Sequence, residues 1–158
     1  MRVRARVGWT ALAVALSWSA WAAAAQDDNE ASRWSLTVVD ETRGPVALRE
    51  VRWSVDGGAE EVRAVTSSAK GEPITVHQAA LPVGGHALHV TLVYEGTGYG
   101  LFSYHRGYHF LVQRDHGLVL DEGQHTRVTV VGRDAGPLGQ PFPEKAALQV
   151  RTTQEPLR

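Results

Sequence analysis

A regular alternation of apolar and polar residues, in short runs divided by turn-forming residues, is the feature that most constrains the fold. In the clearest run, over residues 86–95, Leu88, Val90, Leu92 and Tyr94 occupy every second position. Successive side chains of a β-strand point to opposite faces, so a period of two is typical of a strand with one face in a core. The run therefore predicts a β-strand whose Leu88 face is buried.

Similar runs recur along most of the chain. Turn-forming residues such as Asp56 and Gly57 separate them, and no segment has the sustained apolar stripe of an amphipathic helix. Many short strands with regular turns are typical of a β-sandwich or β-barrel. The sequence thus predicts a single all-β domain. Its strands are expected at residues 34–39, 51–55, 61–66, 74–77, 86–95, 101–105, 108–113, 118–120 and 126–131, with turns at 56–58, 114–117 and 121–123.

The N-terminus has the three parts of a cleavable export signal. Three arginines at positions 2, 4 and 6 form a positive segment, residues 11–25 are apolar and mostly small, and this run ends in alanines. We predict cleavage between Ala25 and Gln26. No two arginines are adjacent in this segment, which favours the general secretory route over the twin-arginine route.

An uncleaved membrane anchor is the alternative for this segment. A spanning helix needs about 20 strongly apolar residues, whereas this run is shorter and is interrupted by Ser17 and Ser19. The chain has no cysteine, so it has neither a residue for lipid attachment nor a disulfide. We expect a periplasmic or secreted protein that is not a lipoprotein, has no membrane span after cleavage, and is held by its core alone.

Composition divides the chain into four parts. Residues 1–25 are the predicted signal peptide, residues 26–32 a polar and flexible start of the mature protein, and residues 33–132 the β-sandwich domain. Residues 133–158 are rich in proline and glycine and are expected to form an extension, with an edge strand near residues 147–151.

Charge and motifs argue against several functions. The 16 basic and 17 acidic residues nearly balance, and no cluster of lysine and arginine indicates binding to nucleic acid or to an anionic membrane. The sequence lacks Gly-x-Ser-x-Gly, His-Glu-x-x-His and a phosphate-binding glycine loop before a helix. We therefore predict no catalytic residues, no metal and no cofactor. An enzyme whose site is assembled from distant strands stays an alternative, because such a site leaves no local motif.

Residues 81–96 resemble a hairpin of exported bacterial sandwich modules. Leu81, Pro82 and Gly84 form a Leu-Pro-x-Gly turn before the alternating strand, which ends near Gly96. Transthyretin-like and carboxypeptidase-regulatory-like domains contain such a turn and strand. Residues 98–110 are also similar to a segment of small exported proteins of δ-proteobacteria. These resemblances imply an Ig-like or prealbumin-like antiparallel β-sandwich in the cell envelope, and they imply no activity.

An aromatic and histidine-bearing segment, residues 98–110, is the candidate binding region. If it is one extended strand, His105 and His109 share a face but lie about 13 Å apart, too far for one zinc ion. If Arg106 and Gly107 form a hairpin turn, His105 and Tyr108 are cross-strand neighbours. The aromatic rings either pack in the core or form an exposed surface for a glycan or a partner strand. In the second case the candidate ligand-binding residues are Tyr99, Tyr104, His105, Tyr108 and His109.

Together, these features favour an exported, non-enzymatic β-sandwich that binds another component of the cell envelope, either a protein or a polysaccharide. The first alternative is a binder of a small ligand or glycan that uses residues 98–110. The second is an enzyme with a site assembled from distant strands. The sequence does not specify the oligomeric state.

Overall fold

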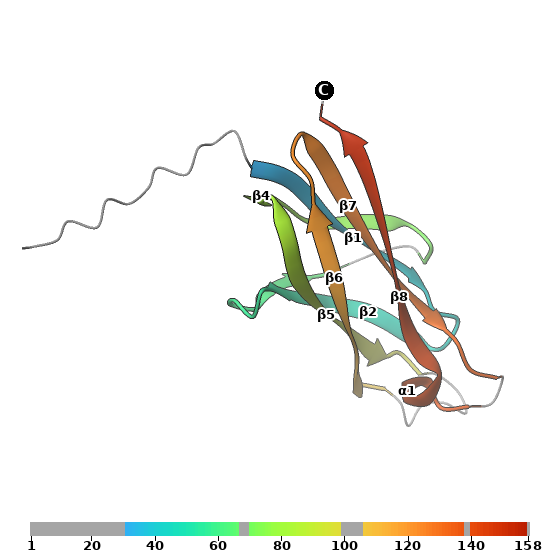
Figure 1. The fold of residues 1–158 in the computed structure, drawn as a ribbon. Helices are drawn as coiled ribbons and strands as arrows, with labels where there is room; N and C mark the ends of the chain where they lie inside the picture. The colour runs from blue at the N-terminus through green and yellow to red at the C-terminus, as the bar shows by residue number, and fades with distance from the viewer. Residues whose placement is uncertain (1–30, 67–69, 99–105, 138–139, 158) are drawn as a thin grey trace, which may run out of the picture.

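The computed structural model describes residues 31–66, 70–98, 106–137 and 140–157. The predicted signal peptide, with its cleavage site at Ala25 and Gln26, lies outside these residues. In the described part of the chain, eight strands form two four-stranded sheets. The two sheets pack face to face (Figure 1), so the predicted all-β sandwich is confirmed.

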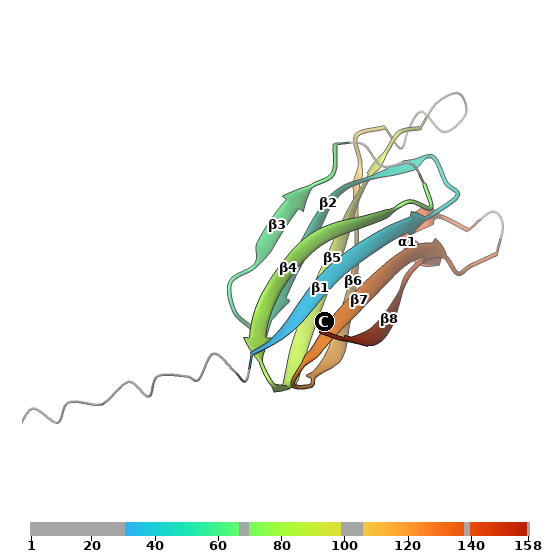
Figure 2. The same ribbon diagram turned by 90° about the horizontal axis from the view of Figure 1, so that it is seen from above.

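Each sheet combines strands that are distant in the sequence. Sheet A has the order β4 (Pro73–Pro82), β1 (Ala31–Glu41), β7 (Gln124–Asp134) and β8 (Ala146–Pro156), which lie side by side in Figure 2. Sheet B has the order β3 (Glu61–Ala64), β2 (Val46–Val55), β5 (Gly84–Gly96) and β6 (His109–Leu120). Neighbouring strands are antiparallel, except that β1 and β7 run parallel. A short helix, α1 (Phe142–Lys145), precedes β8.

The core consists of the alternating apolar side chains of the strands. In β5, the predicted face of Leu88, Val90, Leu92 and Tyr94 is almost fully buried. Sheet A contributes buried side chains such as Trp34. Because burial of one such apolar side chain contributes about 1.5–3 kcal/mol, this layer between the sheets is the main source of stability.

Strand β6 differs from the prediction. The sequence predicts a turn at residues 114–117, but β6 runs without interruption and pairs with β5 along its whole length. Gly117 lies directly opposite Ala87 in this pairing. β6 is an edge strand of sheet B, and an edge strand tolerates polar residues because much of it is open to solvent. The polar composition that indicated a turn is therefore that of an edge strand.

The connection between β5 and β6 contains the predicted turn at Arg106 and Gly107. Gly107 has a φ of 80°, which glycine adopts without strain. An extended strand over residues 98–110 is therefore wrong. Gly96 lies opposite Tyr108, because its backbone N–H donates to the Tyr108 carbonyl at 2.8 Å. His105, the predicted neighbour of Tyr108, lies outside the described residues. The strand expected at residues 101–105 lies outside the described residues.

Both ends of the described chain belong to the sandwich. β1 begins at Ala31, before the expected domain start at Arg33, and the hydroxyl of Ser32 donates to the Gln124 carbonyl at 2.8 Å. β8 includes the predicted edge strand but is longer, and it pairs with β7 throughout. Phe142 and Leu148 are buried in the core. The C-terminal segment thus completes sheet A rather than extending from the domain.

Residues 81–96, which resemble a hairpin, instead connect the two sheets. β4 ends at Pro82 in sheet A, and β5 begins at Gly84 in sheet B. Gly84 has a φ of 133°, a backbone conformation that other residues rarely adopt. The alternating strand that follows is as predicted, but its neighbours are β2 and β6.

A buried polar cluster closes one end of the sandwich. Both the backbone N–H and the hydroxyl of Thr42 donate to Asp40 Oδ1, at 3.0 and 2.7 Å. The Tyr94 hydroxyl, 3.5 Å from the same oxygen, lies over Gly132, and burial together with the Asp40 carboxylate raises the pKa of Tyr94 far above its ordinary value. Lys70 Nζ donates to the Thr42 carbonyl at 2.7 Å. Because buried polar groups are costly unless they are paired, these bonds make the cluster compatible with the core.

Candidate functional site

The outer face of sheet B, which points away from the core, carries exposed apolar side chains. Among the described residues, Val62 of β3 and both Leu111 and Val119 of β6 are more than half exposed. Leu111 lies opposite Val93 of β5, which is on the face opposite to the buried Tyr94 face. Exposed apolar side chains gathered on one face often mark an interaction surface. The outer face of sheet A, by contrast, carries polar side chains at Ser35 and Thr37 in its central strand.

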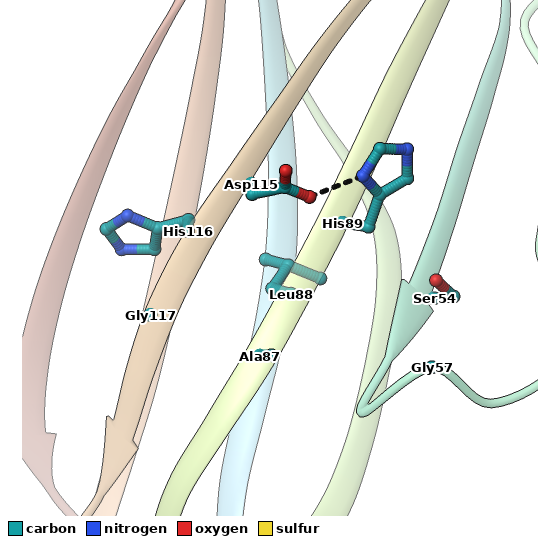
Figure 3. Close-up of a pocket in the computed structure, with 8 residues that line it drawn as sticks. All are labelled: Ser54, Gly57, Ala87, Leu88, His89, Asp115, His116 and Gly117. Atoms are coloured by element: carbon teal, nitrogen blue, oxygen red, sulfur yellow. Dashed lines mark hydrogen bonds and ion pairs between the residues drawn. The ribbon is translucent and has the colours of Figure 1, made fainter.

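A hollow of about 530 Å³ opens on the same outer face of sheet B. Ala87 of β5 and Gly117 of β6 lie opposite each other in the pairing. Ala87 has only a methyl group and Gly117 has no side chain, so no side chain fills the outer face at this point. Ser54, Gly57, His89, Asp115 and His116 surround it (Figure 3), and Leu88 also contributes to the lining. The hollow is thus a consequence of two small residues meeting across neighbouring strands.

A histidine and an aspartate form a hydrogen-bonded pair at one wall of the hollow. His89 Nδ1 lies 2.6 Å from Asp115 Oδ1 (Figure 3), where its N–H donates to the carboxylate. The two residues are directly opposite each other in β5 and β6. The Asp115 side chain is 89% exposed and the His89 side chain 39% exposed. The pair therefore offers a ring edge and a carboxylate oxygen to a ligand from solvent.

Ser54, His89 and Asp115 form a row across β2, β5 and β6, because Ser54 pairs with His89 and His89 with Asp115. These are the residue types of a hydrolase triad, in which the serine donates to the second ring nitrogen of the histidine. Here His89 Nε2 instead lies 3.4 Å from the Thr91 hydroxyl. In the described part of the chain no hydrogen bond joins Ser54 to His89. The row suits hydrogen bonding to a ligand better than activation of a serine.

The C-terminal part of β6, from His116 to Leu120, contacts β8. His116 Nε2 shares a hydrogen bond of 2.9 Å with the Thr152 hydroxyl. Gln154 Nε2 donates to the Val119 carbonyl at 3.2 Å and to Asp121 Oδ2 at 2.8 Å. These bonds join the edges of the two sheets. They leave the stretch of β6 before His116 as its open part.

A second histidine fastens the end of sheet B next to the hollow. His86 Nδ1 lies 2.7 Å from Asp56 Oδ2, and His86 Nε2 lies 2.8 Å from the Pro82 carbonyl. Both neighbours are acceptors, and the charged form of the ring, which has an N–H on each nitrogen, satisfies both of them. The hydrogen bond to Asp56 raises the pKa of His86 above its ordinary value, and the same bond lowers the pKa of Asp56. The charged ring ties the turn after β2 to the start of β5.

The structure describes two of the five predicted binding residues. Tyr108 is 63% exposed and His109 is also exposed, so these two side chains are surface and not core. Phe110 is half-buried, and its ring lies 5.4 Å from that of Phe142. Tyr99, Tyr104 and His105 lie outside the described residues.

Sequence reasoning missed the hollow and its histidine–aspartate pair. His89 and Asp115 are 26 positions apart in the sequence, and Asp115 falls in a segment expected to be a turn. The pairing of Ala87 with Gly117 depends on the register of β5 and β6. No local pattern in the sequence could have indicated this arrangement.

A second, smaller hollow of about 380 Å³ lies beside His125, Glu155, Pro156 and Leu157 of sheet A. His125 Nε2 lies 3.0 Å from the Ser35 hydroxyl, but Ser35 is almost fully buried. The serine hydroxyl is therefore covered by its own sheet, and the contact is structural.

The fold and the hollow define a β-sandwich with one hollowed outer face that carries exposed apolar side chains. Among the described residues, no three histidine, aspartate or glutamate side chains gather as a metal ion would require, and no helix is long and apolar enough to cross a membrane. No protein-family model, curated protein or solved structure matches the chain. The resemblance to transthyretin-like modules therefore stays a prediction.

Proposed function

We propose that this chain is an exported, non-enzymatic β-sandwich protein that binds another component of the cell envelope through the outer face of sheet B. The observation that carries the proposal is the hollow at Ala87 and Gly117. On the same outer face of β6, exposed Val119 lies two positions from Gly117, and exposed Leu111 lies about 20 Å from it along the strand. Apolar side chains around a few convergent polar groups are typical of binding surfaces. The His89–Asp115 pair supplies those polar groups.

The charged residues of this face support binding of a neutral or mixed surface. Arg49 Nε lies 2.6 Å from Glu95 Oε2, and Arg52 is paired with Glu50. These charges neutralise one another within the part of the face formed by β2 and the C-terminal half of β5. Such a face favours a partner that fits by shape and hydrogen bonds over one held by long-range charge.

Site-specific photo-cross-linking in the intact envelope tests this proposal. A photoreactive amino acid at Leu111 should give a discrete adduct, whereas the same group at Thr153, an exposed outer-face residue of sheet A, should not. Gly117→Val should fill the hollow without a clash, because a Cβ at Gly117 meets no atom within 4 Å. The Leu111 adduct should weaken in the Gly117→Val background. Equal adducts from both positions, unchanged by Gly117→Val, would overturn the assignment to this face.

A glycan binder is the second candidate function, because Tyr108 is exposed at the end of sheet B that also carries Leu111. Exposed tyrosine rings are suited to packing against sugar rings. A thermal-shift screen against cell-wall sugars tests it, since a ligand at 100 times its Kd stabilises by about 2.7 kcal/mol. A shift that disappears in Tyr108→Ala and persists in Gly117→Val would favour this candidate over the hollow.

A further inference from the structure

The four edge strands of the sandwich differ in how well they are protected against strand addition. β3 has only 4 residues, and β4 begins at Pro73 and ends at Pro82. β8 ends at Pro156 and sends its side chains at positions 152 and 154 across to β6. Short edges, prolines and covering side chains are the usual protective devices. Each of these three strands has one.

In the described part of the chain, the stretch of β6 before His116 has none of these three devices, although the Phe142 ring of α1 packs against Phe110. β6 has 12 residues, with neither proline nor lysine, and β8 reaches it only from His116 on. No described strand pairs with the outer edge of β6 from His109 to Asp115. Unpaired backbone groups on a strand of this length form a template for another strand.

The hydrogen-bonding pattern shows which residues of β6 offer those groups. The Tyr108 carbonyl accepts from the Gly96 N–H of β5, so even-numbered residues of β6 direct their backbone groups toward β5. The Val119 carbonyl accepts from Gln154 on the opposite side, so odd-numbered residues direct theirs outward. The pairing of β5 with β6 has no shift between these points. Leu111, Gln113 and Asp115 thus have outward backbone groups.

We propose that the open edge of β6 pairs with the same edge of a second copy of this chain, antiparallel and centred on Val112. In this arrangement residues 109–115 of one copy pair with residues 115–109 of the other, since Val112 is the midpoint of the stretch. His109 then lies opposite Asp115 of the second copy, and Leu111 opposite Gln113. Phe110 lies opposite Arg114, which favours a cation–π contact. The contact between His109 and Asp115 recurs on both sides of the twofold axis, and Asp115 keeps its hydrogen bond to His89 within its own copy.

Charge and ladder length select this register over its neighbours. Moving the centre to Gln113 puts Leu111 opposite Asp115 and so an apolar side chain against a carboxylate. Moving it to Leu111 puts Asp115 opposite Gly107, which is in the turn before β6. Arg114 lies on the face of β6 that points toward sheet A. An added strand that placed an aliphatic residue opposite this charged side chain would pair less favourably. In the Val112-centred register it meets an aromatic ring.

The pairing goes beyond the proposed function and adds to it. Two copies joined at β6 form one continuous eight-stranded sheet from their two copies of sheet B. Their outer faces then lie on one surface, with a hollow in each half. A partner with repeated sites would bind such a surface through both hollows.

Single-cysteine variants test the pairing, because the chain has no cysteine of its own. In the proposed dimer, Val112 of one copy lies directly opposite Val112 of the other as a non-hydrogen-bonded pair. The two Cα atoms are then about 4.5 Å apart, within the range that a disulfide spans. Val112→Cys in the purified protein, expressed with its own N-terminus, should therefore give a covalent dimer under mild oxidation. Leu111→Cys serves as the matched control. Its equivalents would be diagonal neighbours about 7–8 Å apart and should remain unlinked.

A proline variant separates the pairing from folding. The Gln113 N–H points away from β5, so Gln113→Pro removes no hydrogen bond of the β5–β6 ladder but blocks an added strand. Sedimentation velocity should show a dimer for the unaltered protein and for Gln113→Ala, and a monomer for Gln113→Pro. Circular dichroism checks that each variant is folded.

Three results would overturn this inference. They are a monomer at all concentrations, a dimer that survives Gln113→Pro, and cross-linking at position 111 in place of position 112. None of them involves an envelope partner, so failure here is distinct from failure of the proposed function.

Discussion

Replacement of Gly132 by alanine is the sharpest test of how the buried polar cluster is packed. A Cβ at this position would lie 2.0 Å from the Tyr94 hydroxyl oxygen and 3.1 Å from Leu92 Cδ1. The Tyr94 ring is fully buried and packs 5.2 Å from the Phe142 ring, so it has little room to move. Overpacking of a core costs about 1–3 kcal/mol and occasionally more. We expect Gly132→Ala to reach the upper part of that range.

The same structure predicts that a second substitution relieves the clash. Tyr94→Phe removes the oxygen that the new Cβ would strike, and by itself it should cost about 0.5–1.5 kcal/mol for a hydrogen bond. The low end of that range applies, because the contact with Asp40 is 3.5 Å long. The double variant should then be more stable than the sum of the two single effects predicts, by about 1–2 kcal/mol, within the usual range for contacting residues.

Urea unfolding of the four proteins, followed by circular dichroism, measures this coupling. The m-value should stay constant across the set, so that differences in midpoint report stability. A Gly132→Ala variant as stable as the original protein would refute the packing argument. So would effects that simply add in the double variant, since they would mean that the two positions do not touch.

Four further predictions concern the ends of sheet B and the hollow. Because the pKa of His86 is raised in the folded protein, the charged ring adds to the free energy of unfolding. This contribution is fully present below the ordinary histidine pKa of about 6.5 and is lost as pH rises through the raised value. Urea unfolding at stepped pH should show the loss, and His86→Asn should reduce the pH dependence of stability. The pKa of Asp56 is lowered, so its effect on stability has the opposite pH dependence. The charged carboxylate stabilises the fold at neutral pH, and this stabilisation is lost on acidification. NMR titration of the carboxylate would follow its protonation. Tyr108→Ala should change stability by less than about 0.5 kcal/mol, whereas Phe110→Ala, which loses partly buried packing, should cost about 1–3 kcal/mol by urea unfolding. Gly117→Val should leave stability within about 0.5 kcal/mol, and a larger loss would mean that the hollow is already filled by a neighbouring group.

The alternating pattern predicted the buried faces of the central strands well. Strand β5 and the Trp34 face of β1 were identifiable because the core leaves an apolar residue at every second position. The hairpin between β2 and β3 was also identifiable from Asp56 and Gly57, which have φ values of 52° and 68°. Aspartate and glycine tolerate this conformation, so the signal for the turn is local.

Edge strands and long-range connections were not predictable in the same way. β6 has buried side chains at Leu118 and Leu120 but exposed polar ones at Arg114 and Asp115, so its composition changes along its length. The parallel pairing of β1 with β7 joins residues about 90 positions apart. Such a pairing is determined by which sheet each strand enters, and no short stretch of sequence records that choice.

The hollow on the outer face is coupled to the core through the register of β5 and β6. The residues that hold this register are on the buried face, where Leu88 and Tyr94 of β5 and Leu118 of β6 all belong to the hydrophobic core. A slip of one residue would turn the buried side chains outward, and a slip of two would preserve the alternation but place His89 opposite Gln113 or Gly117. In either case the pair at 2.6 Å between His89 and Asp115 would be lost. The outer-face site therefore exists only in the register that the core selects, which is why it is not visible in the sequence of either strand alone.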